Sequence, residues 1–566
     1  MATSARSAAA AWASAGVLLA VLALFASGAA LRDAWRTDEH RYLEVARSLG
    51  DQGSWLVPRV NGDVYDDKPP GFFWLTALAH RALGLELARA GMTPSVLAAA
   101  ACVAVAFALA RRLAGPAEAW ATAIVLASSE LFLSLALRAN LDALLTLATT
   151  AAVACYAAAE LGEGSARARR AWLTAGALSL AGGLIVKGFV ALLVPACAVL
   201  GQRLTMRSAR PPRLSSGALA LTALAALALA SLWLLAATLE AGPHYARSLV
   251  LGHGVGHALG VVDKVEAPWY YLRAFPGGFL PWILLFPAAL AHAVRGRRDP
   301  AVRLALAWWL GPFVVLSLIP AKRHLYMAPL HPAAALLVGV LLGERLRGAA
   351  LPPGLVPRLW RLGHGGLGIA GVATGLLMLA AAWSPPDWRG WGEPWTGLLA
   401  AAPLSCGLAP VLGAPLVAGG LGALVLGDAR ARARAIGAVG LAVSASLAWV
   451  FHPIEALGHD HRAFYAEVAR RAGEDPVVSY GGLDYAPNWL LRRREVPDLR
   501  TPEALQTWLR GHPGPVFVIA EAPKVERLGL PLPSEVLVRG ERPLDDTLLL
   551  LRPAAHRPDP AAPPRG

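Results

Sequence analysis

The sequence has few cysteines and few charged residues for its length. Four cysteines occur among 566 residues, and all four lie in apolar segments: Cys102, Cys155, Cys197 and Cys406. Neither a disulfide framework nor a Cys-x-x-Cys metal site is indicated. Charged residues make up 16% of the chain, whereas about 25% is usual for soluble domains. The low charge argues against an ordinary soluble protein.

Several functional signatures are also absent. The sequence has no H-E-x-x-H zinc motif. It shows no internal repeat strong enough to indicate a transporter built from two related halves. The paired-acid D-x-D motif, which would indicate a nucleotide-sugar site, is missing as well.

Long apolar runs are what the chain has instead. Hydrophobic residues make up 56% of it, and runs of about 18 residues or more recur, each able to cross a ~30 Å hydrocarbon layer as a helix. Helices satisfy every backbone group within one segment, as lipid requires. A large soluble helical protein would show amphipathic stripes instead. The sequence therefore predicts an all-α polytopic membrane protein.

The arginines predict how the chain is threaded. The net charge is +14, and short arginine clusters separate the apolar runs, which is the positive-inside pattern. Placing every cluster in the cytoplasm predicts thirteen spans, with the N-terminus inside and an uncleaved first span. These lie near 11–31, 92–112, 117–137, 140–160, 171–186, 188–202, 215–239, 270–292, 302–320, 325–343, 365–383, 396–426 and 433–451.

Two assignments depend on single polar residues. Residues 171–202 could form one long span, but basic flanks on both sides favour two crossings with Lys187 at the outer turn. Residues 71–90 begin apolar but carry His80, Arg81 and Glu86. We expect them to form an interfacial helix rather than a span.

The composition changes after Val450. Short apolar runs at 476–480, 516–520, 535–540 and 547–553 alternate with helical patterns near 459–472 and 502–511. This alternation predicts a small α/β domain outside the membrane. We therefore divide the chain into a transmembrane domain, 1–451, whose first outer loop is 31–91, an extracytoplasmic domain, 452–553, and a proline-rich tail, 554–566, predicted to be disordered.

This topology brings the unusual polar residues to one side of the membrane. They are the loop from Asp38 to Lys68, Asp142, Lys187, residues 240–268 with His253 and His257, the run Lys322-Arg323-His324, and the Trp-rich stretch 383–395. An unpaired charge near mid-membrane costs roughly 2.5–3.5 kcal/mol, so charges at helix ends indicate pairing or use. Such a surface suits an enzyme that handles an anionic, lipid-borne substrate.

Each feature also has a plainer interpretation. Asp38 and Glu39 could be hydrated loop residues, and Asp142 could cap a helix. The lysines could be anchors whose side chains reach the interface. His253 and His257 have the i,i+4 spacing of a metal pair, but without an H-E-x-x-H context a loop or interfacial role is favoured.

One long string carries a family resemblance. Residues 38–74 read DEHRYLEVARSLGDQGSWLVPRVNGDVYDDKPPGFFW, with R-Y-x-E-x-A-R, W-x-V-P, N-G and Y-x-x-K-P-P in order. This string resembles the first outer loop of the aminoarabinose transferase family, relatives of the protein O-mannosyltransferases with the GT-C membrane fold. Further matches are VKGFVALLVP (186–195), EAPWYYL with GGFLPW (266–282) and AKRHLYMAPLHP (321–332).

The resemblance implies an activity and residue roles. The family transfers a sugar from a polyprenyl phosphate carrier to an acceptor, for its best-studied members a lipid A phosphate, outside the bacterial inner membrane. By position, Asp38 matches the catalytic aspartate, with Glu39 beside it, and Asp142 a second acid. The donor and its phosphate would be held by Arg41, Tyr65, Lys68, Lys187, Lys322 and Tyr326.

Some features depart from the family pattern. Asp67 stands where the family usually has a glutamate linked to a metal site, for which His253 would be a partner, so a divalent cation stays open. Lys322-Arg323-His324 replaces a lysine–glycine–lysine pattern. Two other functions also stay open: a flippase for lipid-linked sugars, and a non-catalytic envelope scaffold.

Overall fold

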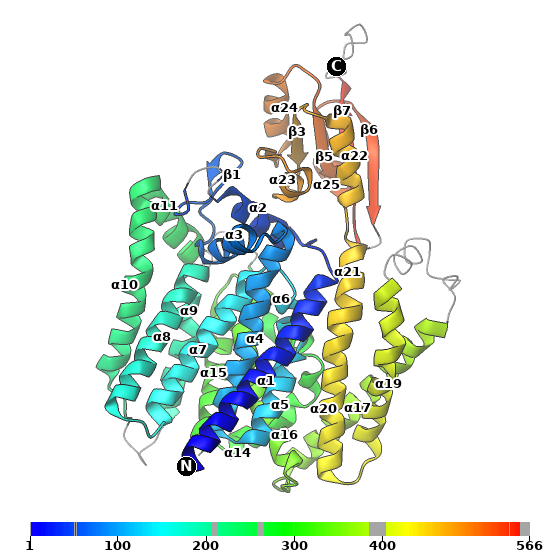
Figure 1. Cartoon of the computed structure of the whole chain (residues 1–566). Helices are drawn as coiled ribbons and strands as arrows, with labels where there is room; N and C mark the ends of the chain where they lie inside the picture. The colour runs from blue at the N-terminus through cyan, green and yellow to red at the C-terminus, as the bar shows by residue number, and fades with distance from the viewer. Residues whose placement is uncertain are drawn as a thin grey trace. The chain divides into compact units, whose positions relative to one another are not determined.

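The structure is a computed structural model of the whole chain (Figure 1). It describes residues 2–49, 51, 54–205, 212–256, 265–297, 299–383, 403–542 and 544–554. The chain forms two compact units, which are described separately. Among the described residues, the first unit holds those within Met1–Leu31, Asp66–Pro385 and Leu404–His452, and the second those within Arg32–Tyr65, Pro386–Pro403 and Pro453–Gly566.

The first unit is a bundle of long apolar helices (Figure 1). Its longer helices, given with the short α6 that follows α5, are α1 (Ala2–Ala30), α4 (Leu87–Leu113), α5 (Pro116–Ala127), α6 (Glu130–Ala136), α7 (Leu141–Leu161), α8 (Ala166–Lys187), α9 (Val190–Thr205), α10 (Ser216–Ala241), α15 (Pro300–Leu318), α16 (His331–Leu346), α17 (Leu355–Trp383), α19 (Pro403–Val425) and α20 (Ala429–Ser446). Many leucines on these helices stay exposed, as lipid-facing residues should.

Shorter elements connect the long helices. They are α3 (Gly71–Leu83), α11 (Pro243–Arg247), η1 (Ser248–Val255), α13 (Tyr270–Gly278), η2 (Trp282–Leu284), α14 (Phe286–Arg295), η3 (His324–Leu330) and η4 (Leu447–Phe451). The predicted span 270–292 is thus three short helices rather than one. Pro276, Pro281 and Pro287 lie in this stretch, and prolines interrupt a helix because they lack the N–H and clash with the preceding turn.

Each predicted span coincides with a helix or a run of helices. In the described part of the chain, seven helices are long and apolar enough to cross a membrane, or eight if α5 and α6, bent by 69°, form one broken span. Shorter apolar helices cover 15–30, 190–205 and 302–318. The polytopic helical membrane fold is therefore confirmed, whereas the number of thirteen crossings stays a prediction.

The two segments whose assignment depended on single polar residues are each interrupted at a glycine. Residues 171–202 form two helices, as predicted, because the chain turns at Gly188, whose φ of 73° is left-handed. Residues 71–83 form α3, which ends at Gly84 with a φ of 63°, and residues 87–90 already belong to α4, so the predicted helix over 71–90 is shorter than expected.

The second unit contains an α/β sheet. After α21 (His452–Gly458), its elements are α22 (Arg462–Ala472), β3 (Val477–Tyr480), α23 (Ala486–Leu491), β4 (Asp498–Leu499), α24 (Pro502–Arg510), β5 (Phe517–Glu521), α25 (Ala522–Leu528), β6 (Ser534–Arg542) and β7 (Asp545–Pro553). The strand order is β4-β3-β5-β7-β6. β3 pairs in parallel with β4 and β5, and β7 pairs antiparallel with β5 and β6.

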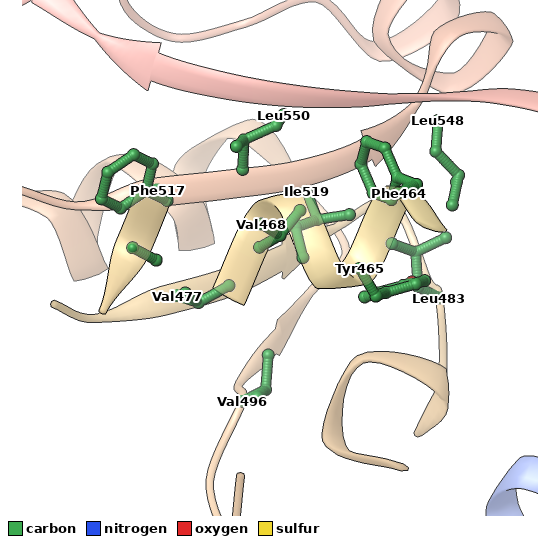
Figure 2. Close-up of a cluster of buried hydrophobic side chains, with 11 residues drawn as sticks. Phe464, Tyr465, Val468, Val477, Leu483, Val496, Phe517, Ile519, Leu548 and Leu550 are labelled. Atoms are coloured by element: carbon green, nitrogen blue, oxygen red, sulfur yellow. The ribbon is translucent and has the colours of Figure 1, made fainter. Parts of the chain in front are cut away.

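The core of this unit follows the alternation of its strands. Phe464 and Val468 of α22 pack with Val477, Ile519 and Leu550 on one face (Figure 2). The intervening strand residues, including Val478, Val518 and Leu549, pack with Leu505 and Leu509 of α24 in a second cluster. Successive side chains of a strand point to opposite faces, so helices cover both sides of the sheet.

Residues 32–65 belong to the second unit, although they follow the first helix. They form α2 (Thr37–Ser48) and a hairpin of β1 (Arg59–Val60) and β2 (Asp63–Val64). Asn61 and Gly62 form its turn with φ of 56° and 82°, as two-residue hairpin turns require. The Asn61 side chain exchanges hydrogen bonds of 3.2 and 3.0 Å with the backbone of Val496 and accepts one of 2.5 Å from Asn488.

Candidate active site

The first unit contains an amphipathic cavity with an empty volume of about 1200 Å³, including the space at its mouth. Its charged lining residues are Asp67, Lys68 and Lys187, and Tyr326 adds a phenol. The rest of the wall is almost entirely apolar: Pro69, Leu184, Gly188, Phe189, Val190, Leu227, Ala230, Ser231, Trp233, Leu234, Leu249, Val250, Leu316, Ile319 and Ala321. The cavity therefore offers two ammonium groups beside a hydrocarbon-like surface.

Lys187 and Asp142 form an ion pair at this cavity. Lys187 is the last residue of α8, and Asp142 lies in the first turn of α7. The ammonium group donates a hydrogen bond to the carboxylate, which is buried, and it lies 5.3 Å from the centre of the Tyr326 ring. The structure thus brings together three residues that the sequence analysis had singled out separately.

Asp142 is not the cap of α7. That role belongs to Asn140, whose side-chain oxygen accepts a hydrogen bond of 2.6 Å from the backbone N–H of Asp142. Asn140 also exchanges backbone hydrogen bonds with the buried hydroxyl of Ser95 on α4, at 2.9 and 3.2 Å. The start of α7 is fixed in this way, so the carboxylate of Asp142 is left for Lys187.

Lys68 enters the cavity immediately before α3. Its ammonium contacts the Asp67 side chain at 2.5 Å, and about a fifth of each side chain is exposed. Two prolines follow, and α3 then begins at Gly71, where an added Cβ would lie 2.9 Å from the Ile185 carbonyl oxygen. The absence of a side chain at Gly71 allows α3 to approach α8, which carries Lys187.

Lys322 has a different environment. Its ammonium donates to the carbonyl oxygens of Glu266, Ile319 and Pro320 at 2.9, 2.6 and 3.4 Å, and the residue is 4% exposed. Beside it, Val265 and Ala321 form an isolated β-bridge. These contacts join the chain before α13 to the end of α15, and Lys322 does not line the cavity.

The second unit carries the other predicted site residues, on α2 and the hairpin. Asp38 and Arg41, one helical turn apart, form an ion pair with 31% and 17% of their side chains exposed. The Arg41 guanidinium also lies 5.2 Å from the centre of the Tyr42 ring. Tyr65 is buried, and its N–H donates to the Pro58 carbonyl oxygen at 2.8 Å. Asp38 is therefore the more exposed of the two adjacent acids in this motif.

Glu39, the neighbour of Asp38, has structural contacts. It is 1% exposed and receives two hydrogen bonds from the buried guanidinium of Arg32, at 2.9 and 2.6 Å. The backbone N–H groups of Trp35 and Arg36 also donate to it at 3.3 Å. Since Glu39 is the third residue of α2, this is a capping interaction at the start of the helix.

The metal candidates receive no support from the described side chains. Among them, no three His, Cys, Asp or Glu residues gather where they could hold a metal ion. Asp67 is paired with Lys68. The side chain of His253, the whole of His257 and residues 384–395 of the Trp-rich stretch lie outside the described part.

Sequence reasoning missed the aromatic wall of the cavity. Trp233 of α10 lies in an alanine- and leucine-rich helix, and its ring contacts Trp74 of α3 and Tyr245 of α11, each with ring centres 6.4 Å apart. A single tryptophan inside a long apolar run was the available signal, because aromatic residues in spans usually gather at the interfaces.

Comparisons with known proteins agree with the motifs. The family model described as dolichyl-phosphate-mannose-protein mannosyltransferase matches residues 67–235. The undecaprenyl phosphate-alpha-4-amino-4-deoxy-L-arabinose arabinosyl transferase of Shewanella sediminis is 33% identical over 331 residues, 58% of this chain and 59% of that protein. The Pseudomonas aeruginosa protein of the same name is 35% identical over 317 residues, 55% and 56% of the two chains. The chain thus spans less than two thirds of these relatives' length.

The fold has a close counterpart among solved structures. ArnT from Cupriavidus metallidurans bound to undecaprenyl phosphate superposes with a TM-score of 0.72 at 20% identity, covering 97% of this chain and 99% of ArnT. Its apo form gives the same score at 21% identity. The predicted resemblance is confirmed, and the fold is the polytopic GT-C type.

Proposed function

We propose that the protein is a membrane glycosyltransferase. It moves a sugar from a polyprenyl phosphate carrier to a lipid or glycan acceptor at the outer face of the bacterial inner membrane. The observation that supports this most directly is the cavity that combines Lys68 and Lys187 with apolar walls. A phosphate attached to an isoprenoid chain needs both surfaces. The named activity of the similar proteins points the same way.

The two lysines would act on the leaving group. Transfer breaks the bond between the anomeric carbon and the phosphate oxygen, so negative charge grows on the carrier phosphate. A fixed ammonium such as that of Lys68 stabilises this charge, and preorganised electrostatics of this kind are usually the largest catalytic contribution. Lys187 would be held ready by Asp142 and Tyr326 rather than being free to move.

Asp38 would act on the acceptor or the sugar, and Arg41 on the phosphate of the carrier. If the acceptor is a hydroxyl, Asp38 would remove its proton as the new bond to the anomeric carbon forms. If the acceptor is an anionic phosphate, no base is required, and Asp38 would orient the sugar. Arg41 can hold phosphate oxygens bidentately, which a lysine cannot do.

The arginine pattern supports an orientation for the chain. We infer thirteen crossings, a cytoplasmic N-terminus and an extracytoplasmic α/β unit. Accessibility labelling of single cysteines introduced at Arg167 and Arg500 in intact cells tests this orientation. The first should be protected and the second labelled.

Transfer and translocation can be separated in one experiment. Purified protein in proteoliposomes that contain lipid A as the acceptor receives a radiolabelled sugar on polyprenyl phosphate, and products are identified by mass spectrometry. We expect sugar on an acceptor and free polyprenyl phosphate. Movement of intact donor across the bilayer without transfer would support a flippase. No change in any lipid, with the protein folded, would support a scaffold.

A further inference from the structure

A second hollow of the first unit lies between α3, α4 and α7. Its empty space is about 1040 Å³, part of it open to the surroundings. It is lined by Leu75, Leu78, Ala79, Ala82 and Leu83 of α3, Thr93, Pro94, Leu97, Ala98 and Ala101 of α4, and Leu144 and Leu147 of α7. We call this the α3 groove. None of its lining residues lines the cavity described above.

The chemistry of the α3 groove selects its occupant. Thr93 is its single polar side chain, and that hydroxyl already donates to the Arg89 carbonyl oxygen at 2.8 Å. A sugar or an extended peptide would find no hydrogen-bond partner there, and unpaired polar groups are costly in such surroundings. A hydrocarbon chain has no polar groups that would be left without hydrogen bonds in the groove. Alanines at positions 79, 82, 98 and 101 create the hollow between the leucines.

The dimensions of the groove match one leaflet. Along α4 the lining runs from Thr93 to Ala101, a rise of eight residue steps or about 12 Å at 1.5 Å per residue. Half of a ~30 Å hydrocarbon core is about 15 Å. The α4 lining residues end at the middle of the helix, whereas Arg111 and Arg112 occupy its last turn. The positive-inside pattern therefore assigns the groove to the outer leaflet.

Charge at the groove is predominantly basic. The last turn of α3 carries His80 and Arg81, both exposed, and α3 contains no acidic residue. Arg89 follows on α4, and Glu86 is the one acid between the two helices. A lipid whose phosphate headgroup carries a net negative charge suits this surface better than a zwitterionic lipid. Ordinary annular lipid would show no such preference.

α3 also connects the groove to the catalytic cavity. Lys68 and Pro69 line that cavity directly before α3 begins, and Trp74 contacts Trp233 in its wall. Leu75 and Leu78, on the same helix, line the groove. A lipid in the groove and a carrier in the cavity would therefore both lie close to α3.

We propose that the α3 groove binds an acyl chain of the acceptor, a phosphate-bearing lipid of the outer leaflet. This proposal rests on the glycosyltransferase function proposed above. The groove positions the acceptor beside the donor, and the basic end of α3 receives the lipid's phosphate.

Photo-crosslinking tests the proposal directly. Full-length protein in nanodiscs is labelled with phosphatidic acid carrying a diazirine in its acyl chain, or with the matching phosphatidylcholine probe, and labelled peptides are mapped by mass spectrometry. We expect labelling of residues 71–101 by the anionic probe, exceeding the zwitterionic probe several-fold. The double variant Ala79→Leu/Ala98→Leu fills the groove and should lose this labelling. Ala220→Leu, on the exposed face of α10, should keep it.

Kinetics then decide whether the bound lipid is the acceptor. The filled variant should raise the KM for a lipid acceptor about tenfold, since each buried methylene contributes roughly fourfold to affinity, with the donor KM unchanged. Equal labelling by both probes, labelling that survives filling, or an unchanged acceptor KM would each overturn the proposal. Labelling as expected, without any transfer by the natural protein, would support the groove as an anionic-lipid site and overturn the glycosyltransferase function instead.

Discussion

Lys187 is paired with Asp142, a residue 45 positions earlier in the chain. The pair joins the end of α8 to the start of α7, and 10% of the Lys187 side chain and 2% of the Asp142 side chain are exposed. Two charges so shielded from water stabilise each other only while both are present. The pair therefore holds an ammonium group at the cavity wall and also ties two helices together.

Removing either charge of this pair should destabilise the first unit. We expect Lys187→Met and Asp142→Asn each to lower the free energy of unfolding by about 3 kcal/mol, because the remaining buried charge loses its partner. The double variant should lose less than the sum of the two. Thermal unfolding in detergent provides the measurement. Strict additivity of the two single effects would contradict the pairing.

Lys68 and Lys322 should behave differently although the sequence analysis grouped them. Lys68→Met removes an ammonium from the cavity, and we expect the rate of transfer to fall by about 10²-fold with little change in stability. Lys322→Met leaves three carbonyl oxygens without their donor, so it should lower the melting temperature instead. Initial rates, normalised to folded protein, separate the two.

The reverse pattern would refute this assignment. If Lys322→Met lowers the rate at unchanged stability, its ammonium serves the reaction and not the loop. Lys68→Arg is the matched control for charge, since it keeps the positive charge and changes its shape. It should retain part of the activity that Lys68→Met loses.

Adjacent acids on α2 provide a second contrast. Asp38→Asn should lower transfer by about 10²–10⁴-fold if the carboxylate is a general base, with the protein still folded. Glu39→Gln should instead cost about 3 kcal/mol of stability, because it leaves the buried Arg32 guanidinium without its carboxylate. Rate and melting temperature are measured on both variants. A catalytic defect in Glu39→Gln at full stability would show that Glu39 takes part in the reaction and does not only stabilise α2.

The sequence was informative where a local pattern decides the structure. The strands at 477–480, 517–521, 534–542 and 545–553 fall where short apolar runs predicted them. The helix predicted near 502–511 is present as α24, and the Thr501 hydroxyl caps it by accepting from the Ala504 N–H at 3.2 Å. These features depend on neighbours within a few residues, so they can be deduced without tertiary contacts.

Features that depend on distant contacts could not be predicted. In the sequence, residues 38 and 39 are two equivalent acids. In the structure, however, Glu39 is paired with Arg32 and caps the start of α2. From the sequence, Lys322 resembles a substrate-binding residue; in the structure, its ammonium group is bonded to three backbone carbonyl oxygens. The assignment of residues 32–65 to the same unit as the C-terminal sheet also needed the fold, because no pattern within 32–65 identifies Val496 as a partner.

Asn61 should be needed to hold the hairpin to the C-terminal segment. Asn61→Ala removes the hydrogen bonds of Asn61 to Val496 and Asn488. It also places alanine, which adopts the left-handed conformation less readily than asparagine, at a φ of 56°. We expect a loss of about 2 kcal/mol or more. Faster proteolysis of residues 32–65 measures the effect. Asn61→Gly keeps the backbone conformation, so it isolates the side-chain contribution. Equal protection in both variants and the natural protein would contradict this role.

His40 should make the second unit sensitive to mild acid. Burial lowers the pKa of His40 to about 4, with Arg32 and His461 also opposing its positive charge and Glu39 favouring it. The unfolded chain protonates this residue near pH 6.5, so it binds more protons than the folded state between those values. Stability is then complete above pH 6.5 and is lost as the pH falls towards 4, by about 2–3 kcal/mol.

Melting temperatures between pH 7.5 and 4.5 test the role of His40. His40→Gln can keep a donor for the Ala34 carbonyl oxygen, which lies 3.2 Å from the His40 ring nitrogen, but it has no proton to gain. The His40→Gln variant should therefore show a smaller fall in melting temperature between pH 7.5 and 4.5. Contacts with His459 and His461 hold the pKa of Asp545 well below its usual range, so the stability from that carboxylate persists throughout this window and is lost only at lower pH. An equally steep decline in His40→Gln would assign the acid sensitivity to other groups.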